Sequence, residues 1–203
     1  MKLFSVMNLR NTFINGLRHF FTKNMPKVNK FGEFHKSSGI TPPTSISGRH
    51  NIYISNNCSI DADSVLYATN AKIVIKQYFI AAKGLTIITG AHERRIGRFC
   101  ASITESEKNH NIGLDRDVII NEDVWTGINV TIMPGVEVGR GCTIAASAVV
   151  TKSTPPYSIC AGVPAKFIKF YWSIDQIIEH EIQLYPKEER YTREELEQIF
   201  EKY

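Results

Sequence analysis

The chain has 203 residues, of which 43% are hydrophobic and 22% are charged, and its net charge is +4. These fractions are ordinary for a globular protein and exclude a wholly disordered chain. No apolar run approaches the roughly 18 residues that a membrane-spanning helix needs, and the small net charge gives no reason to expect a nucleic-acid partner.

The N-terminal part of the chain is basic. Residues 1–50 carry 8 basic side chains and 1 acidic side chain, a net charge of +7. Within them Phe13, Leu17, Phe20 and Phe21 lie on one face of a predicted helix. We expect this helix and its lead-in to cap the open end of the domain that follows. A basic helix lying on a membrane surface is the alternative.

The cysteines bear on the compartment. Cys58, Cys100, Cys142 and Cys160 lie far apart and form no CxxC pair. No secretory signal is visible in the first 25 residues. Both observations favour a reduced protein with free thiols, and we therefore expect a cytoplasmic location.

A repeat of six residues organises the middle of the chain, over residues 51–170. An aliphatic or β-branched residue recurs at every sixth position, and the series is Ile120, Thr126, Ile132, Val138, Ile144 and Val150. Earlier series are Ile75, Ala81 and Ile87, and more weakly Ile54, Ile60 and Leu66. The period fits a short strand followed by a turn, stacked on the next coil, rather than a helix or an alternating strand. The sequence predicts a mainly β solenoid, with Gly127, Gly135, Gly139 and Gly141 expected at its corners.

The repeat deviates at two places. The step from Leu66 to Ile75 is nine residues, and between Ile87 and Ile120 the repeat is lost for 33 residues. Because the second interruption is polar and long, we expect a functional loop over 88–119, with a tolerated surface insertion as the alternative.

His92 is the most informative polar residue, because it lies where the regular coil stops and this loop starts. A histidine there can present a ring nitrogen to a cleft, as a general base requires. Trp125 ends its six-residue unit, where an indole is available for stacking or for a subunit contact.

Other chemistries find no support in the sequence. The six histidines are scattered, with no pair at the spacing of metal ligands, so we expect no metal. No GxSxG nucleophile elbow and no GxxxxGK[ST] phosphate loop occurs.

The C-terminal residues 171–203 have a net charge of −5 and predict two helices. Ser173 starts the first, with Ile177, Ile178 and Ile182 on its apolar side, and Thr192 starts the second. We expect them to form a helical appendage to the solenoid.

Together with the repeat, four motifs resemble the hexapeptide-repeat acyltransferases: Val124-Trp125-Thr126-Gly127, Ile144-Ala145-Ala146-Ser147, Val149-Val150-Thr151-Lys152 and Ala161-Gly162-Val163-Pro164-Ala165-Lys166. The branch they are most similar to contains the sugar and polysaccharide O-acetyltransferases, near the galactoside and maltose acetyltransferases. The resemblance implies a left-handed parallel β-helix, a homotrimer, and acetyl-CoA bound between neighbouring subunits.

The resemblance also implies roles for individual residues. His92, in Thr89-Gly90-Ala91-His92, resembles the catalytic base, and Trp125 would lie by the acceptor pocket. Some relatives use an asparagine one coil before the histidine, for which Asn70 is a candidate. The residues that would line the coenzyme are Gly127, Ala146, Thr151, Lys152 and Lys166.

We therefore expect an acetyl-CoA-dependent O-acetyltransferase that modifies a hydroxyl of a sugar or surface-polysaccharide precursor, a small-molecule or oligosaccharide acceptor. The alternatives are an N-acetyltransferase of an amino sugar or an antibiotic-like amine, and a non-catalytic β-helix scaffold. The metal-dependent carbonic anhydrases of this fold need several histidines at coil positions, which this chain does not offer.

Overall fold

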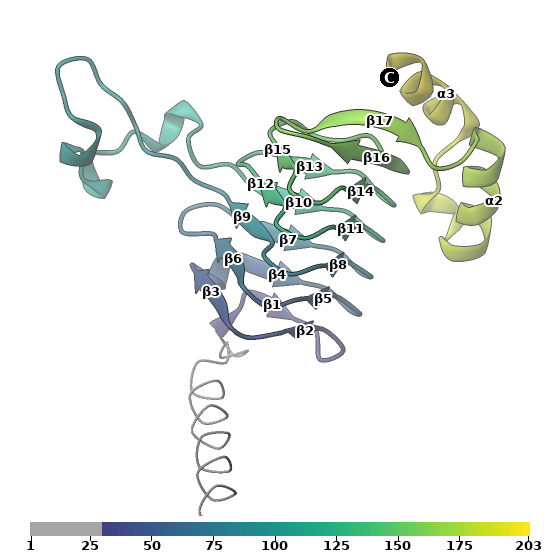
Figure 1. The fold of residues 1–203 in the computed structure, drawn as a ribbon, viewed down its shortest axis with the longest axis horizontal. Helices are drawn as coiled ribbons and strands as arrows, with labels where there is room; N and C mark the ends of the chain where they lie inside the picture. Colours follow the sequence, from purple (N-terminus) through teal and green to yellow (C-terminus); the bar gives the residue numbers. More distant parts are fainter. Residues whose placement is uncertain (1–29) are drawn as a thin grey trace, which may run out of the picture.

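The computed structural model describes residues 30–203, so the helix expected around Phe13–Phe21 lies outside the described residues. The chain winds through three parallel sheets, visiting each sheet once per coil (Figure 1). Sheet A contains β1 (Glu33–Phe34), β4 (Ile52–Ile54), β7 (Ile73–Ile75), β10 (Val118–Ile120) and β13 (Glu137–Val138). Sheet C contains β3 (Thr44–Ser47), β6 (Ser64–Tyr67), β9 (Thr86–Ile88), β12 (Thr131–Ile132) and β15 (Val149–Val150).

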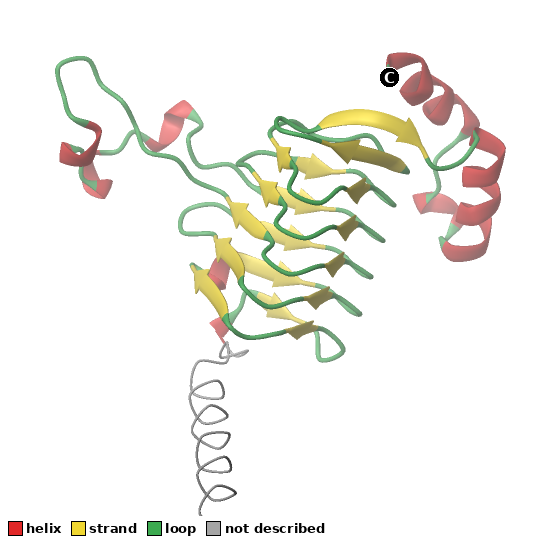
Figure 2. Cartoon of the chain, in the orientation of Figure 1, coloured by secondary structure: helices red, strands yellow, loops and turns green. Residues whose placement is uncertain are grey.

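In each coil the chain passes through sheet B after sheet A and before sheet C. The last strand of sheet B is antiparallel to the others. The parallel strands of sheet B are β2 (Gly39–Ile40), β5 (Ser59–Ile60), β8 (Ile80–Ala81), β11 (Trp125–Thr126), β14 (Thr143–Ile144) and β16 (Ser158–Ala161). Strand β17 (Lys166–Phe170) then pairs antiparallel with β16. The predicted mainly β, parallel β-helix is confirmed, and Figure 2 shows its strands stacked in successive coils.

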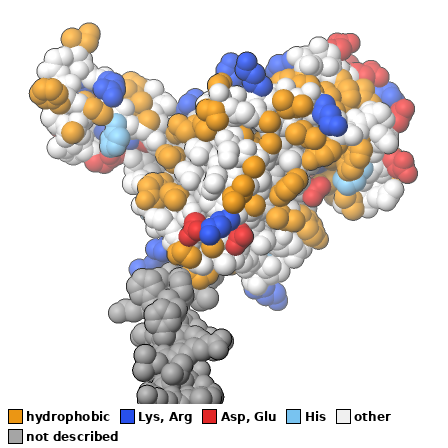
Figure 3. Space-filling view, in the orientation of Figure 1, with side chains coloured by type: hydrophobic (Ala, Val, Ile, Leu, Met, Phe, Trp, Pro, Cys, Tyr) orange, Lys and Arg blue, Asp and Glu red, His pale blue; other side chains and the backbone are white. Residues whose placement is uncertain are grey.

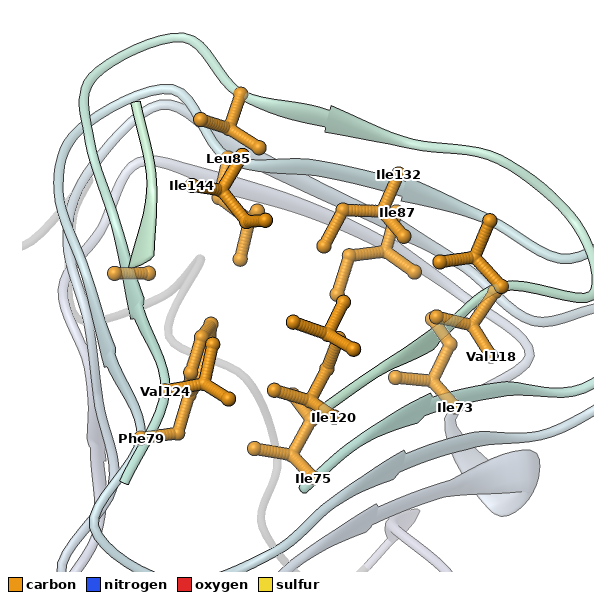
Figure 4. Close-up of a cluster of buried hydrophobic side chains, with 14 of the residues drawn as sticks. Ile73, Ile75, Phe79, Leu85, Ile87, Val118, Ile120, Val124, Ile132 and Ile144 are labelled. Carbon is orange, nitrogen blue, oxygen red and sulfur yellow. The ribbon is translucent and has the colours of Figure 1, made fainter. Parts of the chain in front are cut away.

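The six-residue repeat is the register of this helix. Ile54 pairs with Ile75, Ile75 with Ile120, and Ile120 with Val138, each one coil further along sheet A. All four side chains are buried. Figure 4 shows Ile75 and Ile120 pointing into the interior, towards side chains of the other two sheets such as Val124 and Ile132. In most coils each sheet buries the residue at the repeat position and the residue two places before it, such as Val130 and Ile132. These paired side chains supply the continuous core that stabilises a solenoid.

All the deviations from the repeat occur at one corner, between sheet C and the next strand of sheet A. Within each coil the core positions are six residues apart, as in Ile54, Ile60 and Leu66. The nine-residue step from Leu66 to Ile75 and the 33-residue step from Ile87 to Ile120 both cross this corner. The extra residues therefore leave the core register intact and accumulate on one edge of the solenoid.

The solenoid begins at Glu33, earlier than the boundary at residue 51 that the sequence predicts. Strands β1–β3 form a complete first coil, whose core positions are Phe34, Ile40 and Ile46. These side chains are only partly buried, because a first coil has a described neighbour on one side alone. The first coil consequently lacks the strong aliphatic pattern of the later coils.

All four glycines that the sequence places at corners lie between successive strands of the coil, but they are needed there for two different reasons. Gly135 and Gly141 have φ values of 80° and 64°, the left-handed turn that favours glycine. Gly127 and Gly139 have no such φ. A Cβ on Gly127 would lie 2.7 Å from the backbone nitrogen of Ala146. Gly127 is required by the close approach of two coils rather than by a turn.

Two helices follow β17, as predicted: α2 (Ile174–Leu184) and α3 (Arg193–Lys202). Each begins with a capping box, in which a Ser or Thr side chain and a Gln or Glu side chain satisfy the first backbone amides. Ile177 is buried as expected, but Ile182, expected on the same apolar side, is 56% exposed, because the face of α2 that packs on the protein carries Ile177 and Glu181.

Glu181 connects α2 to the last coils through an ion pair and hydrogen bonds. This buried carboxylate accepts hydrogen bonds from Arg140 Nη1 at 3.0 Å, Tyr157 Oη at 2.7 Å and the Tyr191 amide. Its charge is thus neutralised by a guanidinium, which a buried carboxylate requires. Among residues 30–203, no helix is both long enough and apolar enough to cross a membrane.

Candidate functional site

The two ends of the loop that interrupts the repeat are joined by hydrogen bonds at Thr89, which we call the base of the loop. Thr89 is buried, and its Oγ1 donates to the carbonyls of Tyr67 and Ala71, both at 3.2 Å. The Thr89 carbonyl accepts from the amide of Arg116 at 2.8 Å, where the chain returns. The residues between, which we call the arm (90–115), project away from the solenoid and contain η3 (Cys100–Ser102), η4 (Glu105–Glu107) and η5 (His110–Ile112) (Figure 1).

His92 lies three residues beyond the base of the loop, at a pocket of about 390 Å³. The His92 side chain is exposed, so its ring is accessible to a bound molecule. The pocket lies at the corner between sheets C and A and is lined by Tyr67, Thr69, Asn70, Ile88, Gly90, Ala91, His92, Glu105, Lys108 and Asp115. The solenoid therefore supplies one wall of the pocket and the arm supplies the other.

Asp115 is the most constrained charged group of the pocket, since its side chain is only 8% exposed. Lys108 Nζ lies 2.8 Å from both carboxylate oxygens, and Asn70 Nδ2 and His110 Nδ1 lie 3.2 and 3.3 Å from Oδ2. Burial raises the pKa of Asp115, but the hydrogen bonds from Lys108, His110 and Asn70 outweigh it and hold that pKa below its ordinary value. Asp115 is therefore a fixed anion paired with a fixed cation.

Glu105, His110 and Asp115 are residue types that bind metals, and one ligand atom of each lies within 4.8 Å of the others. Lys108 Nζ already lies among them, 2.8 Å from Asp115 and 3.8 Å from Glu105. The lysine ammonium neutralises the carboxylates, so this cluster is accounted for by its own ion pairs.

Glu93, the neighbour of His92 in sequence, takes part in the arm and not in the pocket. Its buried carboxylate forms a two-point ion pair with Arg95, with Nε at 2.6 Å and Nη2 at 3.0 Å, and accepts from the Asn109 amide at 2.8 Å. These contacts hold the outgoing and returning halves of the arm together.

The structure does not bring Trp125 into the His92 pocket. Trp125 lies on the outer face of sheet B and is 51% exposed. It lines a second pocket of about 220 Å³ together with Asp123, Tyr171 and Trp172. Within one chain, the two residues expected near the acceptor therefore lie in different pockets.

The residues expected to line the coenzyme fall into two groups. Gly127 and Ala146 lie in successive coils at the corner between sheets B and C, within the close approach described above. Lys152 and Lys166 line a third pocket of about 400 Å³. Thr151 directly precedes Lys152 and is exposed.

Comparison with known proteins decides the family. The sequence profile described as "Bacterial transferase hexapeptide (six repeats)" matches residues 117–152. The chain is 32% identical over 171 residues to the protein named "Putative lipopolysaccharide biosynthesis O-acetyl transferase WbbJ" of Escherichia coli (strain K12), covering 82% of this chain and 80% of that protein. The chain belongs to the hexapeptide-repeat acetyltransferases.

Further relatives agree with this family. The "Probable macrolide acetyltransferase" of Lysinibacillus sphaericus is 39% identical over 115 residues, which are 52% of this chain and 64%, slightly under two thirds, of that protein. A maltose O-acetyltransferase structure from Clostridium difficile 630 is 26% identical with a TM-score of 0.59, covering 71% of this chain and 72% of that one. The acetyltransferase VCA0836 of Vibrio cholerae, in complex with acetyl coenzyme A, shares the fold at 24% identity and a TM-score of 0.59, over 72% and 74% of the two chains. The predicted family and the acyltransferase class are confirmed.

In this acetyltransferase the motifs point to His92 as a candidate, but not to most of the residues that line the same pocket. Asn70, considered only as a candidate, lies in the same pocket, whereas Tyr67, Lys108 and Asp115 were not singled out as site residues. The available signal was the density of charged residues in 88–119, which marks a functional loop without saying which side chains face the solenoid.

Proposed function

We propose that this protein is an acetyl-CoA-dependent O-acetyltransferase acting on a hydroxyl of a sugar or surface-polysaccharide precursor, with His92 as general base. The observation that carries the proposal is the exposed His92 in a polar pocket at the base of the arm. The names of the relatives support it, since they include a lipopolysaccharide biosynthesis O-acetyl transferase and a maltose O-acetyltransferase. The four free thiols are consistent with a cytoplasmic enzyme.

In the proposed reaction His92 accepts the proton of the acceptor hydroxyl. A sugar hydroxyl is too weakly acidic to ionise beforehand, so it loses its proton to the imidazole as its oxygen attacks the thioester carbonyl. The new carbon–oxygen bond forms, the carbon–sulfur bond breaks, and the leaving thiolate takes up the proton. A backbone or side-chain donor must hold the developing oxyanion. Asn70 and Glu105 offer polar contacts to the other hydroxyls of a saccharide.

The coenzyme residues fit a phosphorylated, amide-bearing donor. Because Gly127 has no side chain and the two coils lie close together there, backbone groups form the local surface. Backbone N–H and C=O groups can form hydrogen bonds with the amides of the coenzyme arm. Lys152 and Lys166 provide positive charge for its phosphates. We therefore assign Gly127, Ala146, Thr151, Lys152 and Lys166 to the coenzyme.

We further propose that the working unit is a homotrimer with the coenzyme between neighbouring subunits. His92 and Trp125 line different pockets of one chain, so a site that uses both needs two copies. The exposed Trp125 and its neighbour Ile80 on sheet B give that contact an apolar surface.

The His92→Ala variant tests the mechanism. We expect acetyl transfer to fall on the order of 10²- to 10⁴-fold, because the proton then has no acceptor in the transition state. Coenzyme A binding, measured by calorimetry, should remain. His35→Ala, at an exposed histidine in another part of the solenoid, is the matched control. Full activity of His92→Ala would remove the proposed mechanism.

A further inference from the structure

The pocket that contains Lys152 and Lys166 is lined by two parts of the chain, the last coils of the solenoid and the end of α3. Lys152 lies after the last strand of sheet C and Lys166 begins β17, whereas Lys202 and Tyr203 lie at the end of α3. All four line the same pocket of about 400 Å³. The family motifs account for the two lysines of the solenoid and give no role to α3.

Aromatic packing sets the position of α3. Phe200 of α3 stacks on Phe170 of β17, with ring centroids 3.7 Å apart and planes at 6°. Tyr203 packs on Phe167 with centroids 5.3 Å apart, and Phe167 packs on Phe170 at 4.7 Å. Because this cluster joins the end of α3 to β17, Lys202 is held beside the pocket rather than free to leave it.

The charged side chains that line the pocket are all lysines. Its lining contains Lys152, Lys166 and Lys202 and no acidic side chain. In the part of the chain that the structure describes, the ion pairs involve none of these three lysines. Three exposed ammonium groups without counter-ions favour a ligand with more than one negative charge.

Two aromatic residues of the lining, Phe167 and Tyr203, offer a surface on which a ligand ring can stack. Tyr203 is 47% exposed and Phe167 lies against it, so an aromatic surface adjoins the lysines. A purine stacks on such a surface while phosphates meet the ammonium groups. Phosphate and purine occur together at the nucleotide end of coenzyme A and are absent from its pantetheine arm.

We propose that Lys202 and Tyr203 of α3 complete the binding site for the nucleotide end of the coenzyme. This inference rests on the proposed function, because it takes coenzyme A as the donor. It gives the C-terminal helices a function: they bring a third lysine and an aromatic ring to a site whose other half belongs to the solenoid.

Calorimetric titration of the full chain with coenzyme A, and separately with adenosine 3′,5′-bisphosphate, tests the assignment. Lys202→Ala should weaken both ligands roughly twofold to fivefold, the effect of one exposed contact between opposite charges. Lys202→Arg should retain most of the affinity, because it keeps the charge. Lys187→Ala is the matched control, since Lys187 is exposed in η6 (Lys187–Glu189) and does not line the pocket.

The outcomes separate this inference from the proposed function. If the wild type binds coenzyme A and Lys202→Ala binds it equally well, the assignment of α3 is wrong while the proposed function stands. Equal weakening by Lys187→Ala would also overturn the assignment, because the effect would then reflect net charge alone. If the wild type binds no coenzyme A, the proposed function itself fails.

Discussion

Gly90, two residues before His92, is the position where a single methyl group has the largest expected effect on the pocket. A Cβ there would lie 2.6 Å from Asp115 Oδ1. Asp115 cannot move aside freely, because Lys108 and Asn70 hold its carboxylate. The absence of a side chain at Gly90 therefore allows the two ends of the arm to meet at its base.

We predict that Gly90→Ala displaces Asp115, costs about 1–3 kcal/mol of unfolding free energy as overpacking does, and lowers acetyl transfer. Gly39→Ala is the matched control, since a Cβ on Gly39 of β2 meets nothing within 4 Å. Denaturant unfolding and initial rates measure both effects. Equal stability and equal rates for the two variants would show that the Gly90–Asp115 contact is unimportant.

At the same scale, the sequence singles out His92 and Trp125 as candidates because each lies in a short motif. It could not predict the pairing of Asn70 with Asp115, which are 45 positions apart. Their contact depends on the arm returning to Thr89, and no local pattern encodes that closure. Residues that act through local backbone context are readable from sequence, whereas side chains brought together by a loop are not.

The arm is the element whose stability should depend most on pH. The ion pair with Arg95 and the Asn109 amide lower the pKa of Glu93 to about 2. Hydrogen bonds from Thr104, with a contribution from Arg98, lower the pKa of Glu107 to about 2 as well. A carboxylate whose folded pKa is depressed stabilises the folded state above its unfolded pKa, ordinarily about 4.5, and this stabilisation is lost at lower pH.

We therefore predict that the arm loosens as the pH falls from about 4.5 towards 2. Hydrogen-exchange protection factors of the amides in 93–109, corrected for intrinsic exchange, should fall across this range. Glu93→Gln should lower protection at neutral pH and reduce its pH dependence. Protection that stays constant for the wild type down to pH 2 would contradict the role given to Glu93.

The C-terminal helices were predictable as elements, because Ser173 and Thr192 each begin a capping box. Their docking was not predictable. It depends on buried Glu181, which meets Arg140 from 41 positions earlier in the chain. The net charge of the segment, −5, gives no sign of this buried ion pair.

For the whole molecule, the solenoid could be predicted from sequence because an aliphatic or β-branched residue faces the core at every sixth position from Ile120 to Val150. The first coil could not, since Phe34, Ile40 and Ile46 stand among serine, threonine and proline residues and are only partly buried. What sequence periodicity also could not show is that every insertion falls on the corner between sheets C and A, which places the His92 pocket on that edge.

We predict that the purified protein sediments as a trimer, at three times its chain mass of 23.0 kDa. The physical reason is the apolar surface around Trp125 and Ile80, which a monomer would leave exposed to water. Analytical ultracentrifugation measures the mass directly. A monomer at concentrations where the enzyme is active would contradict a site shared between subunits.

The central claim is acetyl transfer from acetyl-CoA to a saccharide hydroxyl. The most direct measurement incubates the wild-type protein with acetyl-CoA and matched acceptors, some bearing only hydroxyl groups and some bearing an amine, and identifies products by mass spectrometry. We predict an acetylated saccharide whose acetyl group is removed by mild alkali, as an ester is. Alkali-stable acetylation of the amines alone, or no transfer to any saccharide acceptor, would contradict the claim.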